Sequence, residues 1–196
     1  MSEETTNTSG QNASHDNLIR EIIVMEEEMF TAVNSSNPDA KSTCQEQLKT
    51  FELMRWMTHS VHSGEYLACY LQDLKAAVEA DRNMMTEKYA IMQGLIPMVL
   101  NDGILFIVTT EWAWLEDLKK EYPNIFANQQ QSIFKAYLQG ELQTLSDECL
   151  DLYAKDVQEG LDSGKNLIKG RYENLYGRLG YKSLEEVEAK AKTAAA

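Results

Sequence analysis

Apolar residues recur every three to four positions along nearly the whole chain after residue 16, which is the spacing of amphipathic helices. Gly, Pro and Ser separate these periodic segments, and no useful length of chain alternates between apolar and polar residues as a strand would. The chain is therefore predicted to be all-α. The pattern places helices near residues 17–34, 43–62, 64–81, 83–93, 104–121, 129–143, 147–162, 165–179 and 184–194.

The sequence also contains an internal repeat, because residues 63–94 align with residues 146–177. We call the displacement along the chain between these two segments the repeat shift. The match needs no gap. The two segments share many more identical residues than chance would give over this length. The identical pairs are Ser63/Ser146, Glu65/Glu148, Leu67/Leu150, Tyr70/Tyr153, Asp73/Asp156, Asn83/Asn166, Tyr89/Tyr172 and Gly94/Gly177. We expect a helical bundle made of two pseudo-two-fold-related four-helix repeats plus a short C-terminal helix.

The pattern also predicts the domain organisation. Residues 1–16 are rich in Ser, Thr, Asn and Glu and have no apolar period, so we expect a disordered tail. Residues 17–196 are predicted to form a single helical domain. In this domain, repeat one covers about 17–101, repeat two covers about 103–180, and the C-terminal helix covers about 184–194.

Two glutamates stand where apolar residues belong. On a helical projection, Glu26 lies close to the centre of the apolar face of the first helix, and Glu111 lies in the middle of the apolar face of the helix at 104–121. These two helices hold equivalent places in the two repeats, although the glutamates are two positions out of register with the repeat shift. A buried carboxylate is costly unless it is paired, so each glutamate should find a cation.

Three cations also stand on apolar faces, Lys88 and Arg171 in the fourth helix of each repeat and Arg55 in the second helix. They are the expected partners of the glutamates. Tyrosines and aspartates at the edge of the third helix of each repeat complete the candidate residues, namely Tyr70, Asp73, Tyr153 and Asp156. Two interpretations remain open: the charges fix the register of the bundle, or they line a polar pocket between the repeats.

Other motifs give weaker signals. His59 and His62 continue the stripe of Arg55, but their helix has no Glu-x-x-His motif, so we expect surface or helix-end histidines and no metal site. The three cysteines, Cys44, Cys69 and Cys149, have no paired spacing and favour reduced thiols in the cytoplasm. Asn83 and Asn166 are predicted helix N-caps. No motif names a cofactor or a catalytic residue.

The net charge of −13 narrows the classes of partner. Nucleic acids and anionic membrane surfaces are bound by clustered Lys and Arg, so neither is expected as a partner. The N-terminus is polar and carries no signal peptide, and the most apolar stretch, residues 95–115, is interrupted by Pro, Asn, Asp, Gly and Glu. The composition therefore predicts a soluble, cytoplasmic protein, and it does not indicate an oligomeric state.

The chain resembles an uncharacterised bacterial family, the domain of unknown function numbered 4125, which is found largely in anaerobes. The resemblance runs from about residue 18 to 188 and implies a shared fold without supplying an activity. This chain has Glu27 where the family usually has Trp, and it differs around residues 56–62. The similar stretches are Glu26–Phe30, Thr43–Gln45, Phe51–Arg55, Tyr70–Ala77, Arg82–Ala90, Glu111–Trp112, Tyr137–Val157 and Tyr181–Val187.

Two functions from different classes follow from these patterns. The first is a small-molecule-binding or enzymatic bundle with a charged pocket between the repeats. Its predicted lining is Glu26, Glu111, Arg55, Lys88 and Arg171. The second is an assembly chaperone or accessory interaction protein for a redox enzyme. Charges that all pair off within the core would favour the second function, and a cavity that reaches both glutamates would favour the first.

Overall fold

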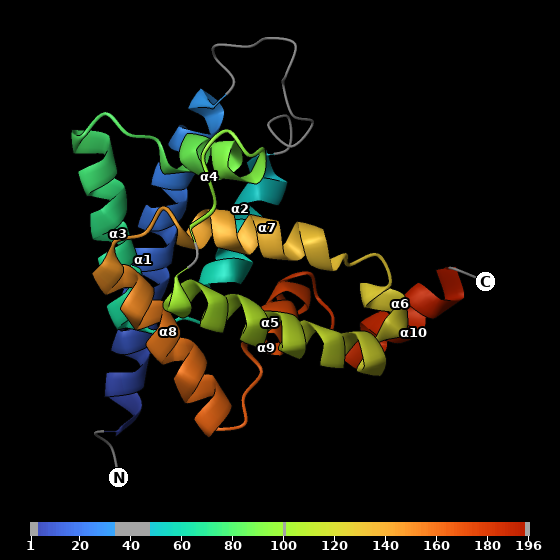
Figure 1. Ribbon diagram of the computed structural model, residues 1–196. Coiled ribbons are helices and arrows are strands. Elements are labelled where there is room, and N and C mark those ends of the chain that lie inside the picture. The colour runs from blue at the N-terminus through green and yellow to red at the C-terminus, as the bar shows by residue number, and fades with distance from the viewer. Residues whose placement is uncertain (1–3, 34–47, 100, 195–196) are drawn as a thin grey trace. The chain divides into compact units, whose positions relative to one another are not determined.

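The computed structural model describes residues 4–33, 48–99 and 101–194, and within these ranges the chain is helical and has no strand. The side chains are described from Ser14 onward. The predicted all-α class is confirmed. Figure 1 shows the order of the helices along the chain. The chain divides into two compact units, one ending at Thr86 and the other beginning at Glu87, and each is described by itself.

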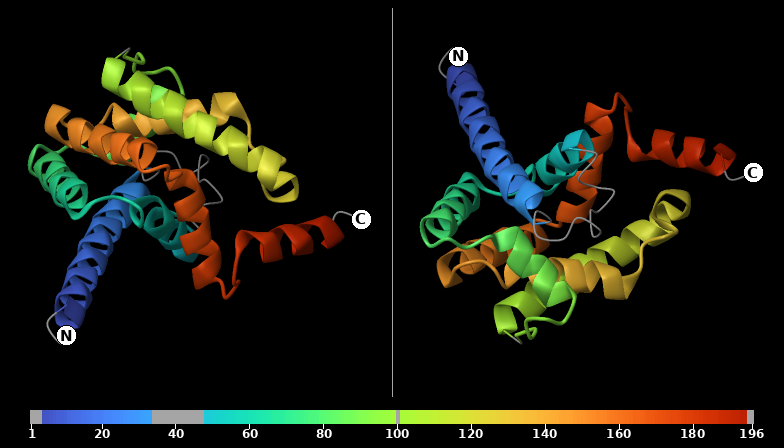
Figure 2. Two further views of the ribbon diagram at one scale, coloured as in Figure 1. Left: turned by 90° about the horizontal axis from the view of Figure 1, so that it is seen from below. Right: turned by 90° about the horizontal axis from the view of Figure 1, so that it is seen from above.

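Unit 1 is organised around one long helix. Helix α1 (Glu4–Ala32), the long blue rod in Figure 2, packs against α2 (Leu48–His59) and α3 (Gly64–Glu79). Helix α3 begins where the Ser63 hydroxyl accepts a hydrogen bond from the backbone N–H of Tyr66 at 3.2 Å, which is a typical N-cap. The apolar side of α1 supplies much of the core, including Ile19, Ile22, Ile23, Met29 and Phe30.

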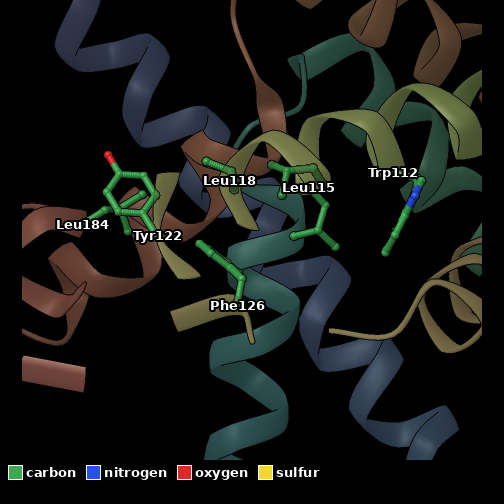
Figure 3. Packing of buried hydrophobic residues seen from close by; sticks show 7 residues of the cluster. Trp112, Leu115, Leu118, Tyr122, Phe126 and Leu184 are labelled. Atoms are coloured by element: carbon green, nitrogen blue, oxygen red, sulfur yellow. The ribbon is translucent and has the colours of Figure 1, made fainter. Parts of the chain in front are cut away.

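Unit 2 is organised around α5 (Asp102–Glu121) in the same way. Helix α5 packs against α6 (Pro123–Phe126), α7 (Gln131–Leu142), α8 (Asp147–Asp162) and α9 (Leu167–Arg178), and α10 (Leu184–Ala194) packs against α6 and α9. Figure 3 shows part of the resulting core, in which aromatic and aliphatic side chains from α5, α6 and α10 converge. The cluster consists of Trp112, Leu115, Leu118, Tyr122, Phe126, Ile168 and Leu184.

Several local features recur in the two units under the repeat shift. The bounds of α3 fall on those of α8 at both ends, and the bounds of α2 fall on those of α7. The Asn83 side chain caps the helix that follows it and donates to the Met29 carbonyl at 2.9 Å. Asn166 makes the matching cap and donates to the Trp114 carbonyl at 3.0 Å. The predicted caps are confirmed, and these contacts support the repeat. The pseudo-two-fold relation stays a prediction.

The units divide inside α4 (Met84–Met92), whereas the predicted repeats meet near residues 101–103. The reason is a set of contacts between α4 and α7. The ammonium of Lys88 is hydrogen-bonded to Glu141, and a Cβ added to Gly140 would lie 3.1 Å from the Lys88 carbonyl oxygen. Glycine therefore allows the two helices to approach closely. The middle of α4 lies with unit 2, and the single domain that the sequence predicts stays a prediction.

Other differences concern helix ends. Helix α1 begins at Glu4, so the predicted start near residue 17 is wrong, and the expected disordered tail is helical from residue 4 onward. Residues 4–16 are rich in Thr, Asn and Ser and carry no apolar period, which is why the pattern missed these turns. The short helix α6 was also not predicted; Pro123 stands at its start, where a missing N–H is tolerated. Pro38 and Cys44 lie outside the described residues.

No helix in the described ranges has the length and the apolar character needed to cross a bilayer.

Candidate functional site

The centre of unit 1 is the carboxylate of Glu26, which is fully buried on α1. Arg55 of α2 holds it with two hydrogen bonds, from Nε to Oε2 at 2.8 Å and from Nη2 to Oε1 at 2.5 Å. The Tyr70 hydroxyl of α3 donates to Oε1 at 2.7 Å, and Nε2 of His59 lies 3.2 Å from both oxygens. Three helices are therefore joined through one carboxylate.

The pKa of Glu26 shows how strongly this centre stabilises the charged form. Burial raises the pKa, but the charge of Arg55 and the charge and hydrogen bond of His59 outweigh burial and lower the pKa from 4.5 to about 2. Glu26 therefore stays ionised at neutral pH. A carboxylate with so low a pKa is a weak general base.

The centre of unit 2 is the carboxylate of Glu111, also fully buried, on α5. Arg171 of α9 donates from Nη1 to Oε2 at 2.8 Å and from Nη2 to Oε1 at 2.9 Å. The Tyr153 hydroxyl of α8 donates to Oε1 at 2.6 Å and accepts from Nη2 of Arg171 at 2.7 Å. The three side chains form a closed triangle in which each contacts the other two.

Burial and the Glu111 carboxylate both change the pKa values of Tyr153 and Arg171. Burial raises the pKa of Tyr153 well above 10, and the nearby Glu111 carboxylate adds to this effect, although Arg171 opposes it. Burial lowers the pKa of Arg171, but Glu111 and Tyr153 outweigh it and hold the pKa above its ordinary value. The tyrosine is therefore neutral and the guanidinium charged, as their hydrogen bonds require.

Lys88 forms a third buried charge centre, in unit 2. Its ammonium lies 2.5 Å from Oε2 of Glu141 and 3.4 Å from the centroid of the Tyr137 ring, so an ion pair and a cation–π contact hold it together. Glu141 was not among the residues predicted from the sequence. Its pairing with Lys88 depends on how α4 and α7 pack, which no pattern within a single helix shows.

The prediction that Glu26 and Glu111 are buried and paired with the predicted cations is confirmed for both residues. Arg55 forms an ion pair with Glu26, and Arg171 forms one with Glu111, whereas Lys88 pairs with Glu141. The candidate aspartates take different positions: Asp156 is buried on α8, and Asp73 is half-buried on α3. That these residues bind a ligand stays a prediction.

Of the two positions expected for the histidines, the helix end is confirmed and the surface is wrong. His59 is the last residue of α2 and His62 follows it closely, but both side chains are buried. His59 contacts Glu26, and its ring lies 5.3 Å from that of Tyr70, while the His62 ring lies 4.5 Å from that of Tyr66. Within the described ranges, no group of three or more His, Cys, Asp or Glu side chains is arranged to hold a metal ion.

An open hollow of about 490 Å³ lies elsewhere on unit 1, along the outer side of α1. Its described lining is Val24, Glu27, Glu28 and Thr31, so none of the candidate charge centres opens into it. The pocket that the sequence predicts between the repeats stays a prediction.

Comparison with known proteins gives the family but no activity. The chain belongs to the family described as protein of unknown function (DUF4125), which it matches over residues 16–189. No curated protein and no solved structure matches the chain.

Proposed function

We propose that this member of the DUF4125 family is an accessory interaction protein, which binds a partner protein through the exposed apolar segment between α4 and α5. We define the docking segment as residues 95–99. An assembly chaperone or accessory subunit of a redox enzyme is a narrower form of the same proposal. The observation that carries the proposal is that this segment is both strongly apolar and held in place.

The docking segment presents four large apolar side chains to solvent. Leu95, Ile96, Met98 and Val99 are all exposed, by 37% to 74%. Leu105, on the first turns of α5, is exposed as well. Single exposed apolar residues are ordinary on protein surfaces, but a contiguous group marks an interaction site.

Two glutamines, Gln139 of α7 and Gln143 directly after it, hold the backbone of the docking segment. The Gln143 side chain accepts from the Val99 N–H at 2.8 Å and donates to the Pro97 carbonyl at 2.9 Å. Gln139 donates to the Val99 carbonyl at 3.4 Å. Because the backbone is already ordered, a partner would lose little conformational entropy in binding it. This supports a preformed surface.

The charge around the docking segment indicates the chemistry of the partner. Residues 89–118 contain no Lys, Arg or His, but they contain the exposed acids Asp102, Glu116 and Asp117. The whole chain carries a net charge of −13. A protein that presents apolar side chains beside Lys or Arg would complement this surface and would be steered toward it.

The charge centres also favour an interaction protein over an enzyme. Both oxygens of Glu26 and both oxygens of Glu111 already accept hydrogen bonds from buried side chains. Because these groups are satisfied within each unit, they act as fixed links between helices. The low pKa of Glu26 supports the same conclusion, since it makes proton abstraction unfavourable.

The test places a photo-crosslinking amino acid at Met98 in cells that naturally contain the protein and identifies the captured protein by mass spectrometry. The purified partner is then titrated against the wild type and against the Leu95→Ser/Val99→Ser double variant. Losing two apolar anchors should weaken binding by at least about tenfold. Circular dichroism and thermal melting should be nearly unchanged, because both side chains are exposed.

The matched control is Val24→Ser/Val78→Ser, which removes two apolar side chains that are each 56% exposed in unit 1. The control should bind the partner with wild-type affinity. If the two double variants lose equal affinity, or if Leu95→Ser/Val99→Ser binds normally, the docking segment is not the interaction site.

A further inference from the structure

The docking segment has a second property besides its apolar side chains, which is the conformation of its backbone. Ile96 precedes a proline, and a residue in this position is restricted to extended conformations. The ring of Pro97 fixes its own φ near the value of the extended polyproline helix. The sequence therefore favours a short extended stretch at this place.

The hydrogen bonds of Gln143 show which way this backbone faces. The single side-chain amide of Gln143 accepts from the Val99 N–H and donates to the Pro97 carbonyl, so both backbone groups point to the same side. In an extended chain, the carbonyl before a residue and the N–H after it share one side, and the residue between them directs its own N–H and C=O to the opposite side. Met98 is that residue.

The side of the docking segment that faces away from the glutamines presents open backbone groups. Within the described ranges, the Met98 N–H, the Met98 carbonyl and the Ile96 carbonyl make no hydrogen bond. Met98 is 42% exposed and Ile96 is 37% exposed, so another chain can reach them. Pro97 has no N–H, but an N–H at that position would face the glutamines, so the open side loses no donor. The open side therefore has the donors and acceptors of a sheet edge.

The two glutamines take the place that a neighbouring strand has in a sheet. A pair of strands alone is only marginally stable in water. Here Gln143 bonds to Pro97 and Val99, and Gln139 donates to the Val99 carbonyl, so one side of the segment is already held. A strand that is added on the open side would therefore pair with a backbone that is already ordered.

We propose that the docking segment is a strand-addition site, at which an extended segment of the partner protein pairs its backbone with Met98. This binding mode rests on the proposed function and specifies how the partner is held. The partner's backbone accepts from the Met98 N–H and donates to the carbonyls of Ile96 and Met98. Its sequence has apolar residues of high strand propensity flanked by Lys or Arg, because residues 89–118 contain acids but no cation.

The experiment uses the full ¹⁵N-labelled chain and, as its probe, a synthetic peptide of sequence KKVTVIVKK, which has strand-forming residues between lysines. Amide hydrogen exchange at Met98 and Val99 is followed by NMR without peptide and with a saturating amount of it. In the free protein, the Met98 N–H should exchange faster than the Val99 N–H, which is bonded to Gln143. The peptide should slow exchange at Met98 by at least about tenfold and leave Val99 nearly unchanged.

Two variants of residue 98 separate the backbone from the side chain. Met98→Pro removes the N–H donor, and the matched control Met98→Ala shortens the side chain but keeps the donor. If the Met98 backbone is paired, Met98→Pro should bind the peptide at least about tenfold more weakly than Met98→Ala does. Circular dichroism should show the wild-type helix content in both variants, since residue 98 lies outside the helices.

Unchanged exchange at Met98, or equal affinities of Met98→Pro and Met98→Ala, would overturn the strand pairing. The proposed function is judged separately, by the binding of the captured partner to Leu95→Ser/Val99→Ser. Weaker binding by that double variant together with unchanged exchange at Met98 would mean that the segment binds through its side chains alone. Because exchange is measured on the wild type, the test stays decisive even if Met98→Pro fails to fold.

Discussion

The charge centres of the two units share a carboxylate and a tyrosine but take their cation from different helices. Glu26 and Tyr70 of unit 1 correspond to Glu111 and Tyr153 of unit 2, and each tyrosine donates to its glutamate. The cation, however, comes from α2 in unit 1 and from α9 in unit 2. A buried carboxylate needs a cation, but the helix that supplies it can differ.

This difference also explains why Lys88 does not pair with Glu26. Lys88 corresponds to Arg171 under the repeat shift, yet Arg55 already holds Glu26, and Lys88 pairs with Glu141. The position that corresponds to Glu141 in unit 1 is Thr58, which cannot form an ion pair. Under the repeat shift, Arg55 of unit 1 stands opposite Leu138, and Glu141 of unit 2 stands opposite Thr58. The ion pairs therefore differ between the two units.

The largest expected effect comes from removing the cation of unit 2. Arg171→Met should lower the free energy of unfolding by about 3–5 kcal/mol, because it leaves the buried Glu111 charge without its bidentate cation. Arg55→Met should cost less, about 1–3 kcal/mol, since Glu26 keeps hydrogen bonds from His59 and Tyr70. Urea unfolding of both variants at neutral pH measures the two losses.

Lys120→Met is a suitable control, because Lys120 makes an exposed ion pair with Asp117 and such pairs contribute little. Equal losses in Arg171→Met and Arg55→Met would show that His59 gives Glu26 no support, and would remove the energetic difference between the two centres.

The sequence revealed the charged positions, because a charge at the centre of an apolar stripe is visible within a single helix. That is why Glu26, Glu111 and the three cations could be found in advance. The pairing could not be found in this way, since Arg55, Lys88 and Arg171 are all plausible partners until the helices are packed. Glu141 was missed for the same reason: its burial depends on the close approach of α4 at Gly140.

The histidines show a different limit. His59 and His62 continue the stripe of Arg55, which was visible in the sequence, but histidine is so often found at surfaces that the pattern alone did not decide its burial. Under the repeat shift His59 aligns with Leu142 of α7, and this comparison would have indicated that His59 is buried. The helix bounds were predicted well where Ser, Asn and Gly mark the ends, as in α3, α8 and α9.

A smaller loss of stability is expected at low pH, and measuring it tests the Glu26 centre of unit 1 directly. The pKa of Glu26 is about 2 in the folded protein and about 4.5 when the chain is unfolded. Because the folded value is the lower one, the stabilisation is complete above pH 4.5 and is lost as the pH falls from 4.5 toward 2. The loss amounts to about 3 kcal/mol or less. Carboxyl ¹³C spectra should show Glu26 titrating near pH 2, and titration at or above pH 4 would contradict the strong pairing.

The smallest change in stability is expected on truncating the first turns of α1, which have no counterpart in α5. When Glu26 is aligned with Glu111, the first residue of α5, Asp102, corresponds to Asn17, and residues 4–16 extend α1 beyond the repeat. Residues 14, 16 and 17 are exposed, and the His15 ring is hydrogen-bonded to the His62 carbonyl at 2.8 Å.

Deleting residues 1–13 should therefore leave the melting temperature nearly unchanged, because the deletion keeps the His15 contact and the apolar face that begins near Ile19. Deleting residues 1–16 removes that contact as well and should cost about 1 kcal/mol more. Calorimetry on both truncated proteins measures the difference. A drop of many degrees on deleting residues 1–13 would mean that the extra turns of α1 pack against the folded protein, and that unit 1 has gained a stabilising element that unit 2 lacks.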